Sequence, residues 1–174
     1  MPHSIFIGLR LTGFLLIQPA KGLGLYYLAK AWLLHARYKY GIAIPEYTLI
    51  GPGLFINRFG GIYLNGDVVV GRNVNITHGT GLGQTNRGPL AGSPIIGDRV
   101  FMGIGCKVLG RVTVGADAVI AVYGVVGKDV PPNAVVGGIP AKLISSQGAT
   151  SYINRQATPE MLARCEDAFV GALP

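Results

Sequence analysis

Aliphatic residues recur at every sixth position through the middle of this chain. The longest unbroken series consists of Ile96, Met102, Val108, Val114, Ile120 and Val126. The residue four places after each member is small or β-branched, as at Val100 and Ala118. A helix cannot use this period, because six matches neither the 3.6-residue turn nor the seven-residue repeat of a coiled coil. The period instead predicts a solenoid in which each unit of six is one short strand and one corner.

Two earlier series have the same spacing. The first runs through Ile44, Ile50, Ile56 and Ile62, and the second, offset by two residues, through Val70, Ile76 and Leu82. Three units of six make one coil of a triangular prism, so residues about 18 apart stack on one another. Glycines that follow the aliphatic position, such as Gly51 and Gly97, let the chain turn at the corners. We therefore predict an all-β fold, a triangular parallel solenoid, over residues 42–144.

Each face of the prism should carry one stacked column of aliphatic side chains. The columns are Ile50, Val70, Ile96 and Val114 on the first face, Ile56, Ile76, Met102 and Ile120 on the second, and Ile62, Leu82, Val108 and Val126 on the third. Eight extra residues interrupt the period between Leu82 and Ile96. This insertion, within Gln84 to Pro94, is polar and rich in Gly and Pro, so it must leave the solenoid. Loops on a rigid scaffold commonly carry function.

The segments that flank the solenoid do not show the period. We divide the chain into an N-terminal helical cap over residues 1–41, the solenoid as catalytic domain, and a C-terminal extension with a short helix over residues 145–174. Leu23 to Tyr38 is predicted to form an amphipathic helix, which covers the open end of the solenoid or, as the alternative, attaches to an anionic membrane surface. Thr158 as N-cap before a proline predicts a helix over Pro159–Val170.

The composition limits the partners and the location. Fifteen Lys and Arg against eight Asp and Glu give a formal charge of +7, but no nucleic-acid-binding motif accompanies it, so we expect no nucleic acid. Cys106 and Cys165 form neither a disulfide framework nor a CxxC pattern, which favours the cytoplasm, with the inner face of the membrane as an alternative. Residues 1–18 lack the cleavage site of a signal peptide, and no apolar stretch reaches about 18 residues.

The hexads resemble those of the hexapeptide-repeat acyltransferases. This resemblance implies a left-handed parallel β-helix, acetyl-CoA as the co-substrate, and a homotrimer whose active-site cleft lies between neighbouring subunits. It also implies a coenzyme A site in the later coils, because the run from Gly137 to Lys142 is similar to the closing motif of this class. The cofactor-binding residues implied are Gly103, Gly105, Ala121, Lys128 and Lys142. The glycines and the alanine leave room for the pantetheine arm, and the lysines supply charge for phosphate.

His78 is the one histidine inside the solenoid, and it faces outward beside the insertion. A hydroxyl that attacks a thioester needs a base that is unprotonated near neutral pH, and histidine ordinarily supplies it. Gamma-type carbonic anhydrases share this solenoid and hold zinc with three histidines. A single solenoid histidine cannot supply such a set, so we predict no metal. Cys106 falls at an interior small position and is assigned to the core.

Four short runs resemble serine acetyltransferases and their relatives encoded for bacterial surface polysaccharides. They are Tyr40–Pro45, Ile50–Leu54, Gly61–Asn65 and Val74–Gly79. In serine acetyltransferases an Asp-His pair should fall at Asn57 and Arg58, and a second His at about Ser93. The polysaccharide-modifying relatives often carry His-Gly at the position of His78, one coil further along.

The sequence therefore predicts an O-acetyltransferase that modifies a sugar hydroxyl in exopolysaccharide or capsule biosynthesis. His78 would act as general base in direct transfer, and a backbone N–H near the insertion would stabilise the oxyanion. The substrate-binding candidates are Asn57, Arg58, Gln84, Asn86 and Arg87. A saccharide should then be a better acceptor than L-serine. Two alternatives stay open: serine O-acetylation in cysteine synthesis, and a non-catalytic solenoid scaffold.

Overall fold

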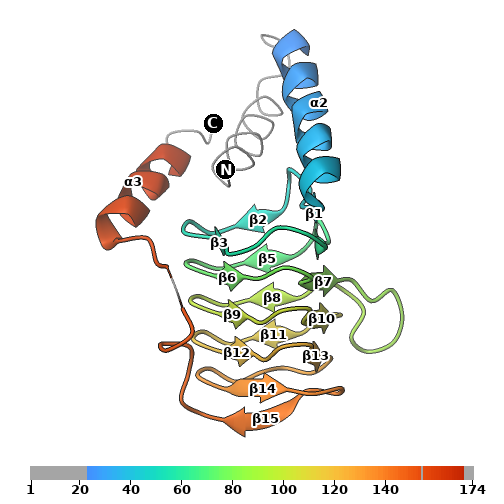
Figure 1. The fold of residues 1–174 in the computed structure, drawn as a ribbon, viewed down its shortest axis with the longest axis vertical. Coiled ribbons are helices and arrows are strands. Elements are labelled where there is room, and N and C mark those ends of the chain that lie inside the picture. Colours follow the sequence, from blue (N-terminus) through green and yellow to red (C-terminus); the bar gives the residue numbers. More distant parts are fainter. Residues whose placement is uncertain (1–22, 154, 171–174) are drawn as a thin grey trace.

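The computed structural model describes residues 23–153 and 155–170. It shows a three-sided column of short strands, with a helix at each end of the described chain (Figure 1). The helices are α2 (Leu23–Tyr40) and α3 (Pro159–Val170). The strands are β1 (Ile42–Ala43), β2 (Leu49–Ile50), β3 (Phe55–Ile56), β4 (Ile62–Leu64), β5 (Val69–Val70), β6 (Asn75–Ile76), β7 (Gly81–Gly83), β8 (Ile95–Ile96), β9 (Phe101–Met102), β10 (Lys107–Leu109), β11 (Thr113–Val114), β12 (Val119–Ile120), β13 (Val125–Val126), β14 (Val135–Gly137) and β15 (Lys142–Ser145).

The strands form three sheets, one for each face of the prism. Sheet A has the order β1-β4-β7-β10-β13, sheet B the order β11-β8-β5-β2, and sheet C the order β15-β14-β12-β9-β6-β3. Neighbouring strands are parallel except for β14 and β15, which are antiparallel. We name the corners by the sheets that they join: the chain passes from sheet B to sheet C, then to sheet A, then back to sheet B.

The register confirms two of the three predicted columns and corrects the third. Ile50 pairs with Val70 on sheet B, and Ile56 pairs with Ile76 on sheet C, as the period predicts. On sheet A, however, Leu64 and not Ile62 stacks beneath Leu82. The reason is that the corner after β3 carries two more residues than the corner after β6. These two residues account for the offset between the first and second series of aliphatic residues.

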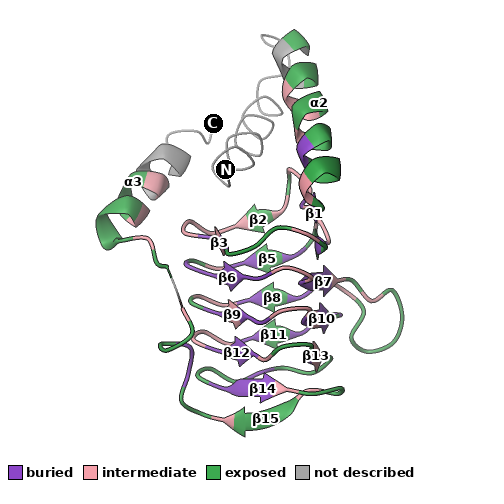
Figure 2. Ribbon diagram, in the orientation of Figure 1, coloured by how far each residue is buried: buried purple, intermediate pink, exposed green. Residues whose placement is uncertain are grey.

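The aliphatic columns form a continuous core along the prism (Figure 2). Ile76, Leu82, Met102 and Val108 are fully buried. Burying an aliphatic side chain of this size contributes about 1.5–3 kcal/mol. Cys106 lies in the same core with no exposed surface, as predicted. The interior is therefore closed, and chemistry is confined to the outer corners and faces.

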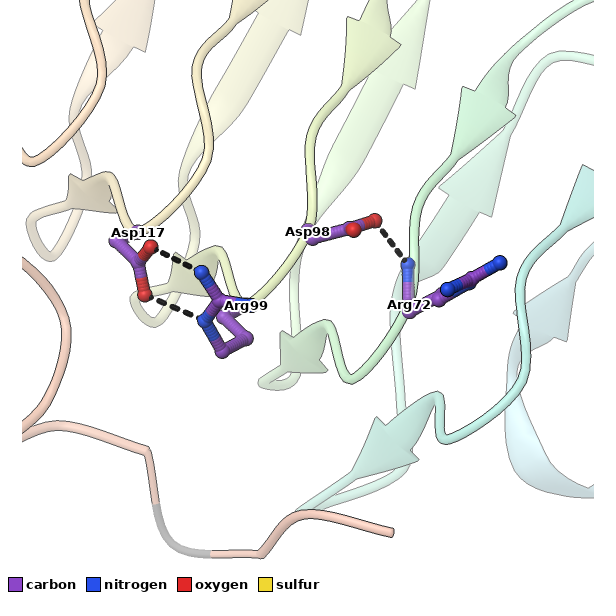
Figure 3. Close-up of polar contacts among 4 residues, drawn as sticks. All are labelled: Arg72, Asp98, Arg99 and Asp117. Atoms are coloured by element: carbon purple, nitrogen blue, oxygen red, sulfur yellow. Dashed lines mark hydrogen bonds and ion pairs between the residues drawn. The ribbon is translucent and has the colours of Figure 1, made fainter. Parts of the chain in front are cut away.

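Charged side chains connect successive coils along the B/C corner (Figure 3). Arg99 makes a bidentate ion pair with Asp117, at 2.6 and 2.8 Å. One coil earlier, the backbone N–H of Arg72 donates to Asp98 at 2.7 Å. Arg99 and Asp117 both have positive φ, 52° and 58°. These contacts hold the corners in register, so we assign the B/C corner a structural role.

Both predicted helices are present, and α2 extends two residues beyond its predicted end. Figure 1 shows α2 projecting away from the β1 end of the solenoid, and Ala36 is its one buried residue among those with described side chains. Tyr27, Leu28 and Trp32 on this helix are exposed. No helix within residues 23–153 and 155–170 is long and apolar enough to cross a membrane. The N-terminal part of the predicted cap or membrane segment, residues 1–22, lies outside the described residues.

The C-terminal extension runs back along sheet C toward the β1 end, where α3 lies (Figure 1). Two buried asparagines attach it to the solenoid. The side-chain amide of Asn75 donates to the carbonyl of Arg155 at 3.0 Å, and the backbone N–H of Ala157 donates to the side chain of Asn73 at 2.8 Å. The predicted N-cap is confirmed, because the side chain of Thr158 accepts from a backbone N–H of α3 at 3.3 Å. The outer side of sheet C is thus covered by the chain itself.

Candidate active site

His78 lies at the C/A corner, between β6 and β7, on a backbone that is fixed from both sides. Gly79 N–H donates to the carbonyl of Gly60 in the coil below, at 2.8 Å, and Gly105 N–H in the coil above donates to the carbonyl of His78, at 3.0 Å. Within the corner the hydroxyl of Thr80 donates to the carbonyl of Thr77, at 2.8 Å. Gly79 has φ of 73°, which a residue with a side chain rarely adopts. The backbone that carries His78 is therefore rigid.

The side chain of His78 is partly exposed, but its Nδ1 atom is not. Nδ1 is buried and has no hydrogen-bond partner among the residues that the structure describes. A buried ring nitrogen without a partner is costly, so its partner is expected from outside the described chain. The described residues thus offer the predicted base, but none of them supplies the group that would orient the imidazole.

Lys107 reaches the same corner, although the sequence analysis does not single it out. It lies on β10, in register with Gly81, and its ammonium group donates to the carbonyl of Gly79. The lysine side chain crosses the outer face of Gly81, where an added Cβ would come within 2.7 Å of its Cδ atom. Glycine at position 81 is therefore needed for the lysine to lie flat. The signal was present in the sequence, because the predicted column that stacks Val108 on Leu82 also places Lys107 on Gly81.

The predicted coenzyme A residues divide between two corners. Gly103 and Ala121 begin the C/A corner in the two coils above His78, and Gly105 lies over Gly79. Lys142 is exposed and pairs with Gly137, at the end of β14 on the same edge of sheet C. These four therefore form one column above His78.

Tyr123 also belongs to this column, and the sequence analysis missed it. Its ring lies over Gly105, where an added Cβ would come within 2.4 Å of a ring carbon. Tyr123 has φ of 55° and is 65% exposed. An aromatic residue in the left-handed region is unusual and is held there by its surroundings. The wall above His78 is thus part aromatic ring and part small residues.

Lys128 lies elsewhere. It follows β13 and precedes the bridge between Val130 and Val114 of sheet B, so it occupies the A/B corner. Within one chain, one strand of sheet A separates Lys128 from the glycine column, and its role in binding coenzyme A stays a prediction.

The inserted loop also leaves from the A/B corner, between β7 and β8 (Figure 1). It is a short hairpin, closed by two hydrogen bonds between the backbones of Thr85 and Gly92, at 3.0 and 2.8 Å. Gln84 is bonded through its side chain to Asn65 at 3.3 Å, and Asn86 and Arg87 are exposed. The three residues of β7, roughly 10 Å of strand, separate this loop from the C/A corner. The loop is therefore not beside His78 of its own chain, contrary to the sequence analysis.

Asn57 and Arg58 lie at the C/A corner one coil below His78. The backbone N–H of Asn57 donates to the carbonyl of Ile76 at 3.0 Å. Both side chains are exposed. Of the predicted acceptor-binding residues, these two share a corner with the histidine, whereas Gln84, Asn86 and Arg87 do not.

The remaining reactive groups do not join the site. Burial raises the pKa of the Cys106 thiol to about 11, so this thiol stays protonated and enclosed at neutral pH. No group of three or more His, Cys, Asp or Glu side chains within residues 23–153 and 155–170 could hold a metal ion. The C/A corner thus offers the imidazole of His78, the positive charges of Lys107 and Arg58, and a wall of small residues and the Tyr123 ring.

No family model matches the chain. The curated relatives and solved structures that it matches are serine acetyltransferases. It is 38% identical over 120 residues to the serine acetyltransferase of Helicobacter pylori strain 26695, covering 69% of this chain and 70% of that protein. Among solved structures it is similar to the serine acetyltransferase of Brucella abortus in complex with coenzyme A, with 32% identity and a TM-score of 0.71 over 82% of this chain and 55% of that one. A serine complex of the Neisseria gonorrhoeae enzyme matches with 30% identity and a TM-score of 0.67, over 81% and 55%.

These comparisons confirm the left-handed parallel β-helix and the hexapeptide-repeat acetyltransferase resemblance. They overturn the predicted sugar acceptor, because the matched relatives are serine acetyltransferases. The chain spans 42% and 51% of the length of two other curated serine acetyltransferases that it matches. It belongs to the serine acetyltransferase family.

Proposed function

We propose that this protein transfers the acetyl group of acetyl-CoA to the hydroxyl of L-serine. The observation that carries the proposal is a partly exposed histidine on a rigid corner, beneath a column of small residues, in a chain of this family. The relatives matched over the solenoid include one solved with serine and one solved with coenzyme A. Both ligands are therefore chemically reasonable for the C/A corner of this chain.

His78 acts as the general base in a direct transfer. The serine hydroxyl loses its proton to the imidazole as its oxygen attacks the carbonyl carbon of the thioester. A carbon–oxygen bond forms, the carbon–sulfur bond breaks, and the proton passes to the departing thiolate. The products are O-acetylserine and coenzyme A. Cys106 does not form an acyl-enzyme in this mechanism, because its thiol is buried and protonated.

Acetyl-CoA lies along the column above His78. Gly103 has no side chain and Ala121 only a methyl group, which leaves room for an extended pantetheine arm at these two positions. Tyr123 offers an exposed ring along the same path, and Lys142 is placed to meet a phosphate group at the far end. The thioester then approaches His78 from the C-terminal side of the solenoid.

The complete site is shared between copies of the chain, which assemble as a homotrimer. For Nε2 of His78 to accept a proton, Nδ1 must carry one, and its buried N–H then needs an acceptor. No described residue of the same chain supplies it. A three-fold arrangement with each sheet A turned toward the axis brings the C/A corner of one copy against the A/B corner of the next. The loop and Lys128 then reach the site from the neighbouring chain.

Thiol release from acetyl-CoA tests the function directly. With purified protein, L-serine should stimulate release of free coenzyme A, and mass spectrometry should detect O-acetylserine in equal amount. Glucose and N-acetylglucosamine, offered at the same concentration, should not stimulate release. Serine-independent hydrolysis, or release with every acceptor except serine, would contradict the proposal. A chain that neither binds coenzyme A nor releases thiol would support the scaffold alternative.

A further inference from the structure

Arg58 lies one coil below His78 at the same corner. The two strands that lead into these corners pair in register, Ile56 with Ile76, and the next residue, Asn57, continues the ladder. Arg58 therefore leaves sheet C at the level where His78 leaves it in the coil above. Adjacent coils are about 4.8 Å apart, the spacing of neighbouring strands.

The backbone that carries Arg58 is anchored on both sides. The ring of Phe59 packs edge-on against Tyr40, with 5.7 Å between the centroids. The carbonyl of Gly60 accepts the hydrogen bond from Gly79 N–H. This corner also contains the two extra residues that shift the register of sheet A. Arg58 is thus held on a fixed, outward-bulging corner beneath His78.

The charge of Arg58 is not neutralised by the described part of the chain. Its side chain is exposed, and none of residues 23–153 and 155–170 forms an ion pair or hydrogen bond with it. Arg99, by contrast, is paired with Asp117 on a different corner. An exposed guanidinium within one coil of a general base is suited to an anion that belongs to the substrate. Arginine binds a carboxylate through two parallel hydrogen bonds.

We infer that Arg58 binds the carboxylate of the acceptor whose hydroxyl faces His78. The inference rests on the proposed function and names the recognition element of its acceptor. In serine, three bonds separate the hydroxyl oxygen from the carboxylate carbon, a span that fits two groups on adjacent coils. The acceptor class is therefore a small hydroxy compound with a carboxylate close to the hydroxyl. Uncharged hydroxy compounds lack the group that Arg58 recognises.

The test compares L-serine with L-serinamide, which keeps the hydroxyl and loses the carboxylate. In the wild type, kcat/KM for L-serine should exceed that for L-serinamide by at least about tenfold. Arg58→Met should raise KM for L-serine by about 10- to 100-fold with little change in kcat, and should leave L-serinamide unaffected. Arg58→Lys should restore part of the serine affinity. Arg164→Met, an exposed arginine on α3, is the matched control and should change neither acceptor.

Binding measured by NMR titration in the presence of coenzyme A separates this inference from the proposed function. Binding of L-serine that weakens in Arg58→Met, without acetyl transfer by the wild type, would retain the carboxylate site and contradict the proposed function. Equal binding of L-serine and L-serinamide by the wild type would overturn the carboxylate site. An equal loss of both acceptors in Arg58→Met would also overturn it, because it would indicate a structural role.

Discussion

At the scale of single residues, the carbonyl of Gly79 is the point where Lys107 meets the corner of His78. A charge-assisted hydrogen bond to this carbonyl restricts the peptide between Gly79 and Thr80, next to the histidine. Lys107 is therefore a positioning residue for the base, and Gly81 is the residue that lets it lie there.

We predict that Lys107→Met lowers kcat for L-serine by about tenfold, because the corner loses one charge-assisted bond. Gly81→Ala should lower kcat to a similar extent with the lysine still present, since the new methyl group displaces its side chain. Steady-state kinetics with thermal melts checks this. Affinity for coenzyme A and the melting temperature should stay near the wild-type values. Normal turnover in both variants would remove Lys107 from the site.

His78 could be identified from the sequence because it interrupts an array in which almost every neighbour is aliphatic or small. The predicted stacking of Val108 on Leu82 also places Lys107 on Gly81, but the sequence does not show that the ammonium group of Lys107 bonds to the carbonyl of Gly79. The prediction that His78 lies beside the inserted loop is wrong within one chain. The three residues of β7 place His78 and the loop at opposite edges of sheet A.

At the scale of elements, the C-terminal extension is held to sheet C by polar contacts of two buried asparagines, Asn73 and Asn75. Asn75 is 1% exposed, and its amide group spans from the carbonyl of Asn73 at 3.2 Å to that of Arg155 at 3.0 Å. Apolar contacts add to these bonds: the rings of Phe101 and Tyr152 lie 5.7 Å apart, and Ala149 belongs to a buried cluster with Val119. A peripheral segment of this kind should open at a lower free energy than the coils of the solenoid.

Asn75→Ala should release this segment while leaving the coils folded. Amide hydrogen exchange should become at least about tenfold faster over residues 150–165 and stay unchanged in β9 to β13. Thr150→Ala, an exposed position on the same extension, is the matched control and should exchange like the wild type. Faster exchange throughout the solenoid would instead show that Asn75 supports the core.

The order of elements was predictable because the period of six is a backbone requirement: each coil must bury one aliphatic residue per face. The predicted limits of α3 are correct, since the Thr158-Pro159 pair marks its start. The column of Ile62 was predicted wrongly. A series of isoleucines at perfect spacing conceals the two extra residues, and both Ile62 and Leu64 are buried, so hydrophobicity alone does not reveal the register.

At the scale of the whole molecule, the corner that carries His78 and the corner that carries the inserted loop lie on opposite edges of sheet A, and the proposed site combines them from two chains. We predict that sedimentation equilibrium at micromolar concentration gives three times the mass of the chain. A monomer with full activity would contradict the shared site. Recovery of activity after two inactive variants are mixed is a sharper test, because each site of a trimer would combine corners from two different chains.

The mixing experiment uses two inactive chains, His78→Ala and a chain whose loop residues 86–89 are replaced by two glycines. Refolded together, they should form some sites with an intact histidine from one chain and an intact loop from the other. Random assembly makes about one quarter of the sites complete. Recovered activity near that fraction supports the shared cleft, whereas no recovery would place the whole site within one chain.

The central claim is that His78 is the base that activates a serine hydroxyl. The most direct measurement is serine-dependent thiol release by His78→Asn compared with the wild type, at saturating acetyl-CoA. We predict a fall in kcat of about 10²–10⁴, the usual contribution of a general base, with the affinity for coenzyme A and the trimer unchanged. Near-normal turnover by the variant would contradict the claim.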